Sequence, residues 1–324
     1  KDEFEIIKTF KGGSLSSTHL INHPNYKKSI LKVVSHEKNR EYGFVRFCSQ
    51  IKRHNQLQNL EPELFPKILQ IGIDIKNKEA FCLYEFMEDY ISLFDYLNNH
   101  KISEVDLHKS ALNLINALKR LHTHSYNLPL LSGSIEFYIK EEMIRPLLRY
   151  EDYLNVNDKY FEDIKVESIA QTISRIYKEL NSIQIDSQKS CITHGNSTLE
   201  NILVNPKTLE ISFIDVYDET YCDFAISDYS QIIQCSKYYY GIRMRYQNLK
   251  ESEHNYNLMK PNNNFILFNN TIERNLISNL EEKKLLNLFS ASQFIRLLPF
   301  RIENNDDLNA NYFYSLASWI LQKN

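Results

Sequence analysis

The residues best suited to chemistry lie in the stretch THGNSTLENILVNPKTLEISFID, residues 193–215. Within it, Asn201 offers a side-chain amide oxygen, and Asp215 offers a carboxylate at the end of an apolar run. A hard divalent cation that bridges phosphate oxygens takes oxygen ligands of these two kinds. Asn201 and Asp215 are therefore candidate ligands for a cation such as Mg²⁺.

The spacing of this loop points to phosphoryl transfer. Asn201 follows Asn196 by five positions, as the metal-binding asparagine of protein kinases follows the catalytic aspartate. The run HGNSTLENIL resembles the His-Gly-Asp-x-x-x-x-Asn loop of the aminoglycoside phosphotransferase and choline kinase superfamily, and FIDVYD resembles its metal-binding strand. The resemblance extends over most of the chain. It implies a two-lobed phosphotransferase that uses ATP or GTP with Mg²⁺, in which His194 holds the loop.

A second acidic segment follows the metal-binding strand. Cys222-Asp223-Phe224-Ala225 through Asp228 resembles the Gly-Asp-x-x-x-x-Asp segment of the superfamily. The resemblance implies that Asp228 is a buried acceptor that braces the catalytic loop. Cys222 stands where the superfamily has glycine.

The N-terminal third contains the lysine that the resemblance implies for the nucleotide phosphates. Lys32 lies in the apolar run ILKVV, where kinases carry their phosphate-binding lysine. Glu41, in the helical pattern that follows, is its predicted partner, because it precedes the apolar face that docks the helix. Glu37 is the competing partner.

Two further segments are predicted to contact the nucleotide. Gly12, Gly13 and Ser14 join the first two strands, and small residues there let backbone N–H groups approach the phosphates. Glu85 and Met87 follow an apolar strand at the lobe boundary, where members of the superfamily present backbone groups to adenine. Only their position in the chain marks them.

Asn196 stands where the superfamily has its catalytic aspartate. A neutral amide cannot take a proton from the attacking hydroxyl, although its oxygen can orient that hydroxyl. Because a general base contributes about 10²- to 10⁴-fold, transfer should be slow while nucleotide binding is retained. Three explanations stay open: an engineered replacement that traps a complex, a natural nucleotide-binding pseudokinase, or an active enzyme that uses another base such as Glu200.

The predicted acceptor is a hydroxyl of a small molecule. The segment from Asp228 to Gln234, running into Tyr240-Gly241, resembles phosphotransferase-like proteins of bacterial capsule and surface-sugar synthesis, which implies a sugar, polyol or nucleotide-sugar acceptor. Tyr240, Arg243 and Arg296 are the predicted acceptor residues, since arginine forks bind phosphate or carboxylate and aromatic faces stack on sugar rings. Pairing of these arginines with carboxylates such as Glu303 is the alternative.

Hydrophobic periodicity predicts the elements that position these residues. The fold class is α+β: a small antiparallel N-lobe with one helix over residues 1–88, and a larger, mainly helical C-lobe over residues 89–324. Asn205-Pro206-Lys207 is predicted to join a short hairpin between the loop and Asp215. The expected strands cover residues 4–10, 18–22, 29–34, 68–74 and 79–86. A helix is expected over residues 36–51, with an apolar face formed by Tyr42, Phe44, Val45, Phe47, Cys48 and Ile51. Two further amphipathic helices are expected in the C-lobe, one with the apolar residues Leu107, Ala111, Leu114, Ile115, Leu118 and Leu121, and one with Ile164, Ile169, Ile173, Ile176 and Leu180.

Composition and charge limit the class of partner. The 324 residues include 38 basic and 41 acidic side chains, a net charge of −3, which disfavours a nucleic-acid partner. Five scattered cysteines form no metal-ligand pattern and suggest free thiols in a reducing compartment. With no signal-peptide pattern and no run of about 20 apolar residues, a soluble cytoplasmic protein is expected. His122 and His124, two positions apart, are expected not to be ligands.

Overall fold

The computed structural model describes residues 4–10, 16–34, 36–98, 101–124, 132–154, 158–184, 189–218, 222–245 and 254–323, without the side chains of 36–42 and 132. The chain divides into two compact units. The N-terminal unit comprises residues 1–96, 194–196 and 201–220, and the helical unit comprises 97–193, 197–200 and 221–324. The predicted α+β class, with a small antiparallel sheet and a larger helical part, is confirmed. The chain first passes from the N-terminal unit into the helical unit after Tyr96.

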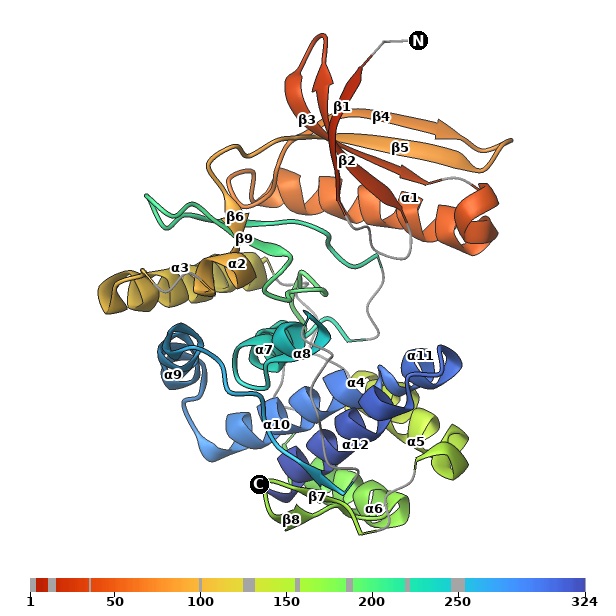
Figure 1. The fold of residues 1–324 in the computed structure, drawn as a ribbon, viewed down its shortest axis with the longest axis vertical. Helices are drawn as coiled ribbons and strands as arrows, with labels where there is room; N and C mark the ends of the chain where they lie inside the picture. The colour runs from red at the N-terminus through yellow and green to blue at the C-terminus, as the bar shows by residue number, and fades with distance from the viewer. Residues whose placement is uncertain are drawn as a thin grey trace. The chain divides into compact units, whose positions relative to one another are not determined.

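The N-terminal unit is built on a five-stranded sheet in the order β1-β2-β3-β5-β4, with every neighbouring pair antiparallel (Figure 1). All five predicted strands are present. The register places Lys32, in the centre strand, between Thr18 and Cys82. The bounds are β1 Glu5–Phe10, β2 Ser17–His23, β3 Lys27–Val34, β4 Ile68–Asp74 and β5 Glu79–Glu85.

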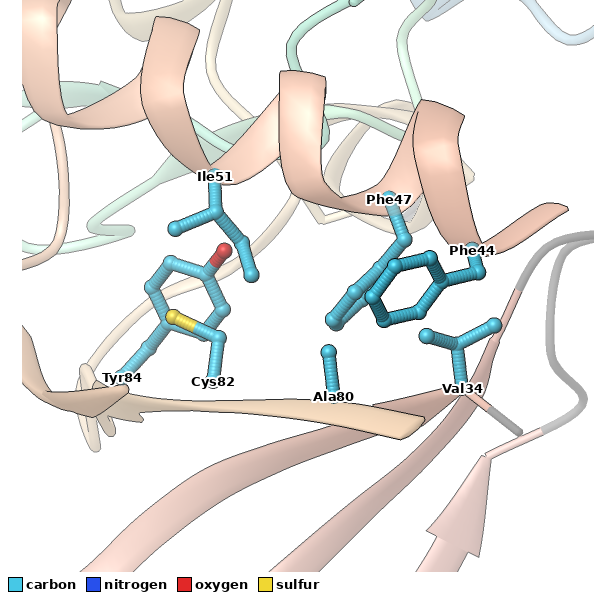
Figure 2. Packing of buried hydrophobic residues seen from close by; sticks show 7 residues of the cluster. All are labelled: Val34, Phe44, Phe47, Ile51, Ala80, Cys82 and Tyr84. Atoms are coloured by element: carbon cyan, nitrogen blue, oxygen red, sulfur yellow. The ribbon is translucent and has the colours of Figure 1, made fainter. Parts of the chain in front are cut away.

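Helix α1, His36–Leu60, lies across one face of this sheet (Figure 1). Phe44, Phe47 and Ile51 point from the helix toward the sheet, because positions three and four apart share one helical face. Figure 2 shows these three side chains above Val34, Ala80, Cys82 and Tyr84. Val45, expected on the same face, is 53% exposed, since it lies one position off this stripe.

A second, three-stranded sheet follows the loop that carries Asn196. Strands β6 Ile91–Ser92, β9 Ile202–Val204 and β10 Ile211–Phe213 pair in the order β10-β9-β6, and β9 and β10 are antiparallel. The predicted hairpin is thus confirmed. Its turn is closed by the Asn205 side-chain oxygen, which accepts a 2.9 Å hydrogen bond from the Lys207 N–H.

The helical unit packs α10 against α7 and α12, and α3 against α9. Its apolar residues from Leu107 to Leu121 are buried on α3 as predicted. The helix predicted from Ile164 to Leu180 is shorter than expected, because α6 begins at Ile169. A capping box of Ser168 and Gln171 starts this helix, and Ile164 lies in β8. The bounds are α2 Leu93–Leu97, α3 Glu104–Thr123, α4 Ser132–Ile139, α5 Arg145–Arg149, α6 Ile169–Asn181, α7 Ala225–Ser236, α8 Tyr240–Arg245, α9 Asn263–Leu276, α10 Leu280–Ile295, α11 Leu298–Glu303 and α12 Asp307–Gln322, with β7 Tyr160–Phe161, β8 Ile164–Lys165 and β11 Asn255–Tyr256.

Two short irregular helices occur near α4 and α5: a π-helical turn at Lys140–Ile144 and a 3-10 turn at Glu151–Tyr153. Among the helices of the described ranges, none has the length and apolar character needed to cross a membrane.

Candidate nucleotide and metal site

Lys32 and Asp215 form an ion pair within the N-terminal unit. Lys32 projects from β3, and its Nζ contacts Asp215 Oδ1. Burial lowers the pKa of the Lys32 ammonium to about 8. The neighbouring carboxylate of Asp215 favours the charged form, so we expect a protonated lysine at neutral pH. A cation on the central strand and a carboxylate from the segment after β10 are thus adjacent.

The backbone of Asp215 adopts a left-handed conformation, with φ of 56°. Aspartate tolerates this region better than most residues, but it persists only where surrounding contacts hold it. Two such contacts are present. The Ile214 N–H donates to the Asn201 carbonyl at 2.9 Å, and the Asn196 side-chain nitrogen donates to the Asp215 carbonyl at 3.0 Å. These bonds bring the predicted catalytic-loop and metal residues into one cluster.

The loop that carries Asn196 is held by His194, as the resemblance implied. The buried imidazole donates from Nε2 to the Ile214 carbonyl at 2.9 Å, and its Nδ1 accepts the Asn196 N–H at 3.2 Å. Gly195, between them, has φ of 77°, a conformation that glycine adopts without steric cost. His194 therefore acts as a support for the loop, with both ring nitrogens bonded to backbone groups.

Asn201 is oriented by its own loop. Its side-chain nitrogen donates to the Asn196 carbonyl at 2.9 Å. Since this bond uses the nitrogen, the amide oxygen is the atom of Asn201 suited to a cation. An amide oxygen and a carboxylate are the kinds of donor that fit Mg²⁺, which prefers a few protein oxygens together with phosphate oxygens.

The predicted adenine-binding segment lies at the end of β5. The Glu85 N–H donates to the Lys67 carbonyl at 2.9 Å, and the Met87 carbonyl accepts the Tyr90 N–H at 3.1 Å. The segment is therefore fixed on both sides by backbone bonds. Gly12, Gly13 and Ser14 lie outside the described residues, as does the side chain of Glu41, so their predicted roles stay predictions.

Sequence reasoning missed a contact of α1 with the segment after β10. Arg46 donates from Nε and Nη2 to the two carboxylate oxygens of Asp218, at 2.9 and 2.7 Å. The pair joins residues 172 positions apart, and nothing local in either segment signals it.

The helical unit contains a buried network around Asp228. The Ser197 hydroxyl donates to the Asp228 carbonyl at 2.8 Å and approaches its carboxylate at 3.3 Å. Asp228 Oδ2 lies 2.9 Å from His122 Nε2, and Gln231 Oε1 accepts the Ser197 N–H at 2.5 Å. The carboxylate is fully buried. Asp228 thus contacts Ser197, a residue of the loop that the resemblance implied it would brace, but the part played by His122 was missed.

The three predicted acceptor residues lie in the helical unit. Arg243 is buried, donates to Asn309 Oδ1 at 2.9 Å, and stacks 3.8 Å from the centroid of the Tyr312 ring. Arg296 is a quarter exposed and lies 3.6 Å from the Glu142 carboxylate. The Tyr240 hydroxyl accepts a 3.4 Å bond from Arg301. These contacts are internal to the unit, and the predicted substrate roles stay predictions.

The sequence and the structure of this chain were compared with those of known proteins. No protein-family model matches the sequence, and no curated protein resembles it in sequence. Solved structures do resemble it. A thermostable mutant of aminoglycoside phosphotransferase APH(4)-Ia has a TM-score of 0.62 at 9% identity, covering 99% of this chain and 95% of the other.

Two more structures are similar over comparable lengths. The GDP and kanamycin complex of APH(2")-IIIa has a TM-score of 0.58 at 12% identity, covering 99% and 95%. A putative fructosamine-3-kinase from Thermobifida fusca has a TM-score of 0.58 at 9% identity, covering 99% and 93%. The chain has the two-lobed, protein kinase-like fold of the aminoglycoside phosphotransferases and related small-molecule kinases.

Proposed function

We propose that this protein binds ATP or GTP with Mg²⁺ and transfers phosphate to a hydroxyl of a small molecule. The observation that carries the proposal is the cluster of Lys32, Asn196, Asn201 and Asp215 in the N-terminal unit. Phosphoryl transfer requires a cation for the phosphates, oxygen ligands for a metal and a fixed catalytic loop. Lys32 is the cation, Asn201 and Asp215 offer the oxygens, and His194 holds the loop.

Each residue of the cluster has a distinct role. Lys32 binds nucleotide phosphate oxygens, which replace the Asp215 carboxylate as its partner. Asn201 and Asp215 hold Mg²⁺, which supplies positive charge that stabilises the transferred phosphoryl group. Backbone groups of Glu85 and Met87 bind the base. That a structural neighbour is a GDP complex supports a nucleotide site of this kind.

Asn196 makes transfer slow. Its amide orients the acceptor hydroxyl but cannot accept the proton, so a general-base contribution of about 10²- to 10⁴-fold is absent. Positioning and electrostatic stabilisation supply most of the catalysis of phosphoryl transfer, and these remain. We therefore propose an impaired enzyme that keeps its nucleotide affinity.

The acceptor is a sugar, polyol or nucleotide sugar. Support comes from the resemblance of the segment that begins at Asp228 to proteins of bacterial surface-sugar synthesis, and from fold neighbours that are sugar-acting kinases by name. Arg296 is the candidate contact for an anionic acceptor, because its side chain is a quarter exposed. Tyr240 is the candidate for ring stacking.

Thermal stabilisation by nucleotide tests the proposal. A ligand that binds only the folded state contributes about 2.7 kcal/mol at 100 times Kd, which a thermal-shift assay detects. We expect ATP or GTP with Mg²⁺ to raise the melting temperature. Lys32→Met should lower the nucleotide affinity about 10- to 100-fold. Asp215→Asn should remove the part of the melting-temperature increase that depends on Mg²⁺. Lys28→Met is the matched control, because Lys28 is an exposed lysine of the same strand. Absence of any shift with either nucleotide would refute the proposal.

A second candidate function is a nucleotide-binding module without transferase activity. The bond from the Asn196 amide to the Asp215 carbonyl favours it, since an aspartate at position 196 could not donate that bond. The two candidates differ in the response to Asn196→Asp: a transferase gains activity, and a binding module does not.

A further inference from the structure

Arg46 and Asp218 form a bidentate ion pair within the N-terminal unit. Its two hydrogen bonds, at 2.9 and 2.7 Å, have the bidentate geometry in which a guanidinium binds a carboxylate most strongly. Asp218 is nearly buried, with 5% of its side chain exposed. Water therefore screens this pair less than it screens an exposed pair such as Lys28 and Glu88.

The pair connects α1 with the segment that carries Asp215. Asp218 lies three residues after Asp215, and Tyr217 lies between them. The Tyr217 N–H donates to the His194 carbonyl at 3.1 Å, and the Arg46 guanidinium lies 5.1 Å from the centroid of the Tyr217 ring. Arg46 thus contacts two consecutive residues of a segment that is also bonded to the catalytic loop.

The conformation of Asp215 makes such support necessary. A left-handed non-glycine residue persists only where the surrounding structure holds it. On the N-terminal side, the Phe213 and Ile214 N–H groups donate to the Leu64 and Asn201 carbonyls at 2.7 and 2.9 Å. On the C-terminal side, the anchors are the Tyr217 bond and the ion pair of Asp218 with Arg46. The ion pair is the anchor that depends on α1.

We propose that Arg46 and Asp218 are positioning residues that hold the Asp215 carboxylate in the orientation that binds a divalent cation. Neither side chain is a predicted ligand, and both act through the backbone of residues 215–218. The docking of α1 on the segment therefore sets the metal affinity of the site. The inference rests on the proposed function for its metal, but the positioning effect can be measured without any ligand.

Hydrogen exchange of the ligand-free protein tests the positioning effect. The variants are Arg46→Gln, which removes the charge, Arg46→Lys, which keeps the charge without the fork, and Asp218→Asn. Ile51→Val is the control, because it disturbs the packing of α1 on the sheet without touching the pair. We expect faster exchange of the Tyr217 amide in Arg46→Gln and Asp218→Asn, an intermediate rate in Arg46→Lys, and the wild-type rate in Ile51→Val.

A Mg²⁺ titration at fixed ATP concentration, followed by melting temperature, tests the link to the metal. Loss of a residue that orients a metal ligand typically costs about 10- to 100-fold in metal affinity. In Arg46→Gln we expect the Mg²⁺ concentration that gives half of the maximal melting-temperature shift to rise by about 10- to 100-fold. The rise should be smaller in Arg46→Lys. Binding of metal-free ATP should be unchanged in both variants.

The outcomes separate this inference from the proposed function. Unchanged exchange at Tyr217 in Arg46→Gln overturns the positioning role, whatever the nucleotide does. If exchange of the Tyr217 amide is faster in Arg46→Gln but the Mg²⁺ requirement is unchanged, the pair has a structural role only. That result overturns the link to the metal. If the wild-type protein binds no Mg²⁺-ATP, the proposed function and that link both fail, while the exchange result still decides whether the pair orders residues 215–218.

Discussion

The side-chain nitrogen of Asn196 donates a 3.0 Å hydrogen bond to the backbone carbonyl of Asp215. The aspartate that the superfamily has at this position could not make this bond, because an ionised carboxylate only accepts hydrogen bonds. The amide of Asn196 therefore makes a contact that helps hold Asp215 in its left-handed conformation. Asn196 thus occupies the proposed position of the general base, and its side chain is also bonded to a proposed metal ligand.

Restoring the carboxylate separates these two roles. We expect Asn196→Asp to raise the rate of transfer to a hydroxyl by about 10²-fold or more, because it supplies the missing general base. The affinity for metal-free ATP should change little, since the base acts on the acceptor. ADP release in the presence of a panel of sugars and polyols measures the rate, and Asn196→Ala, which lacks both roles, is the control. An unchanged rate with weaker Mg²⁺-dependent ATP binding would instead identify a nucleotide-binding module.

His54 should make the stability of the N-terminal unit depend on pH. Burial lowers the pKa of its imidazole to about 4, and its Nε2 lies 2.8 Å from the Pro66 carbonyl. Between pH 6.5 and 4 the unfolded chain binds a proton that the folded chain does not, so stability is full above pH 6.5 and falls as the pH is lowered. The loss approaches about 3 kcal/mol at most.

Denaturant unfolding at pH 7 and pH 5, followed by the exchange of amides in α1, measures this effect. The substitution His54→Gln keeps a side-chain donor for the Pro66 carbonyl but does not titrate, so it should flatten the pH dependence. An equally steep dependence in His54→Gln would show that another group is responsible.

The buried network at Asp228 should be costly to break. Asp228→Ala removes the carboxylate from both His122 and Ser197, and we expect a loss of about 3 kcal/mol from the helical unit, as is typical when a buried polar network loses a charged member. Tyr229→Phe is the milder control, because it removes only the 3.3 Å contact of the hydroxyl with His122 Nδ1. Hydrogen exchange of α7 amides reports the difference. Equal losses in the two variants would contradict a central role for Asp228.

Arg243 and Arg296 should respond differently to substitution. The contacts of Arg243 with Asn309 and Tyr312 favour a packing role, so Arg243→Gln should lower the melting temperature without a specific effect on the acceptor KM. Arg296→Gln, at a partly exposed ion pair, should raise the acceptor KM and leave ATP binding unchanged. These constants are measured in the Asn196→Asp background, if that variant is active. A reversed pattern would assign the acceptor to Arg243.

Local patterns in the sequence determined the elements of this protein. Alternating and helical periodicities located the five strands, α1 and α3, because each pattern reflects which side of an element is buried. Turn residues located the β9-β10 hairpin. The spacing of Asn196, Asn201 and Asp215 identified the candidate site, since a short loop and the strand that follows it bring such residues together.

Only the tertiary structure decided which distant side chains meet. Arg46 pairs with Asp218 across 172 positions, and His122 meets Asp228 across 106. The sequence suggested Arg243 as an acceptor contact, and the fold buries it against Tyr312, where an aromatic face and an amide replace its hydration. Periodicity reports whether a side chain is buried, but the partner of a buried charge depends on how separate elements pack, and no local pattern contains that information.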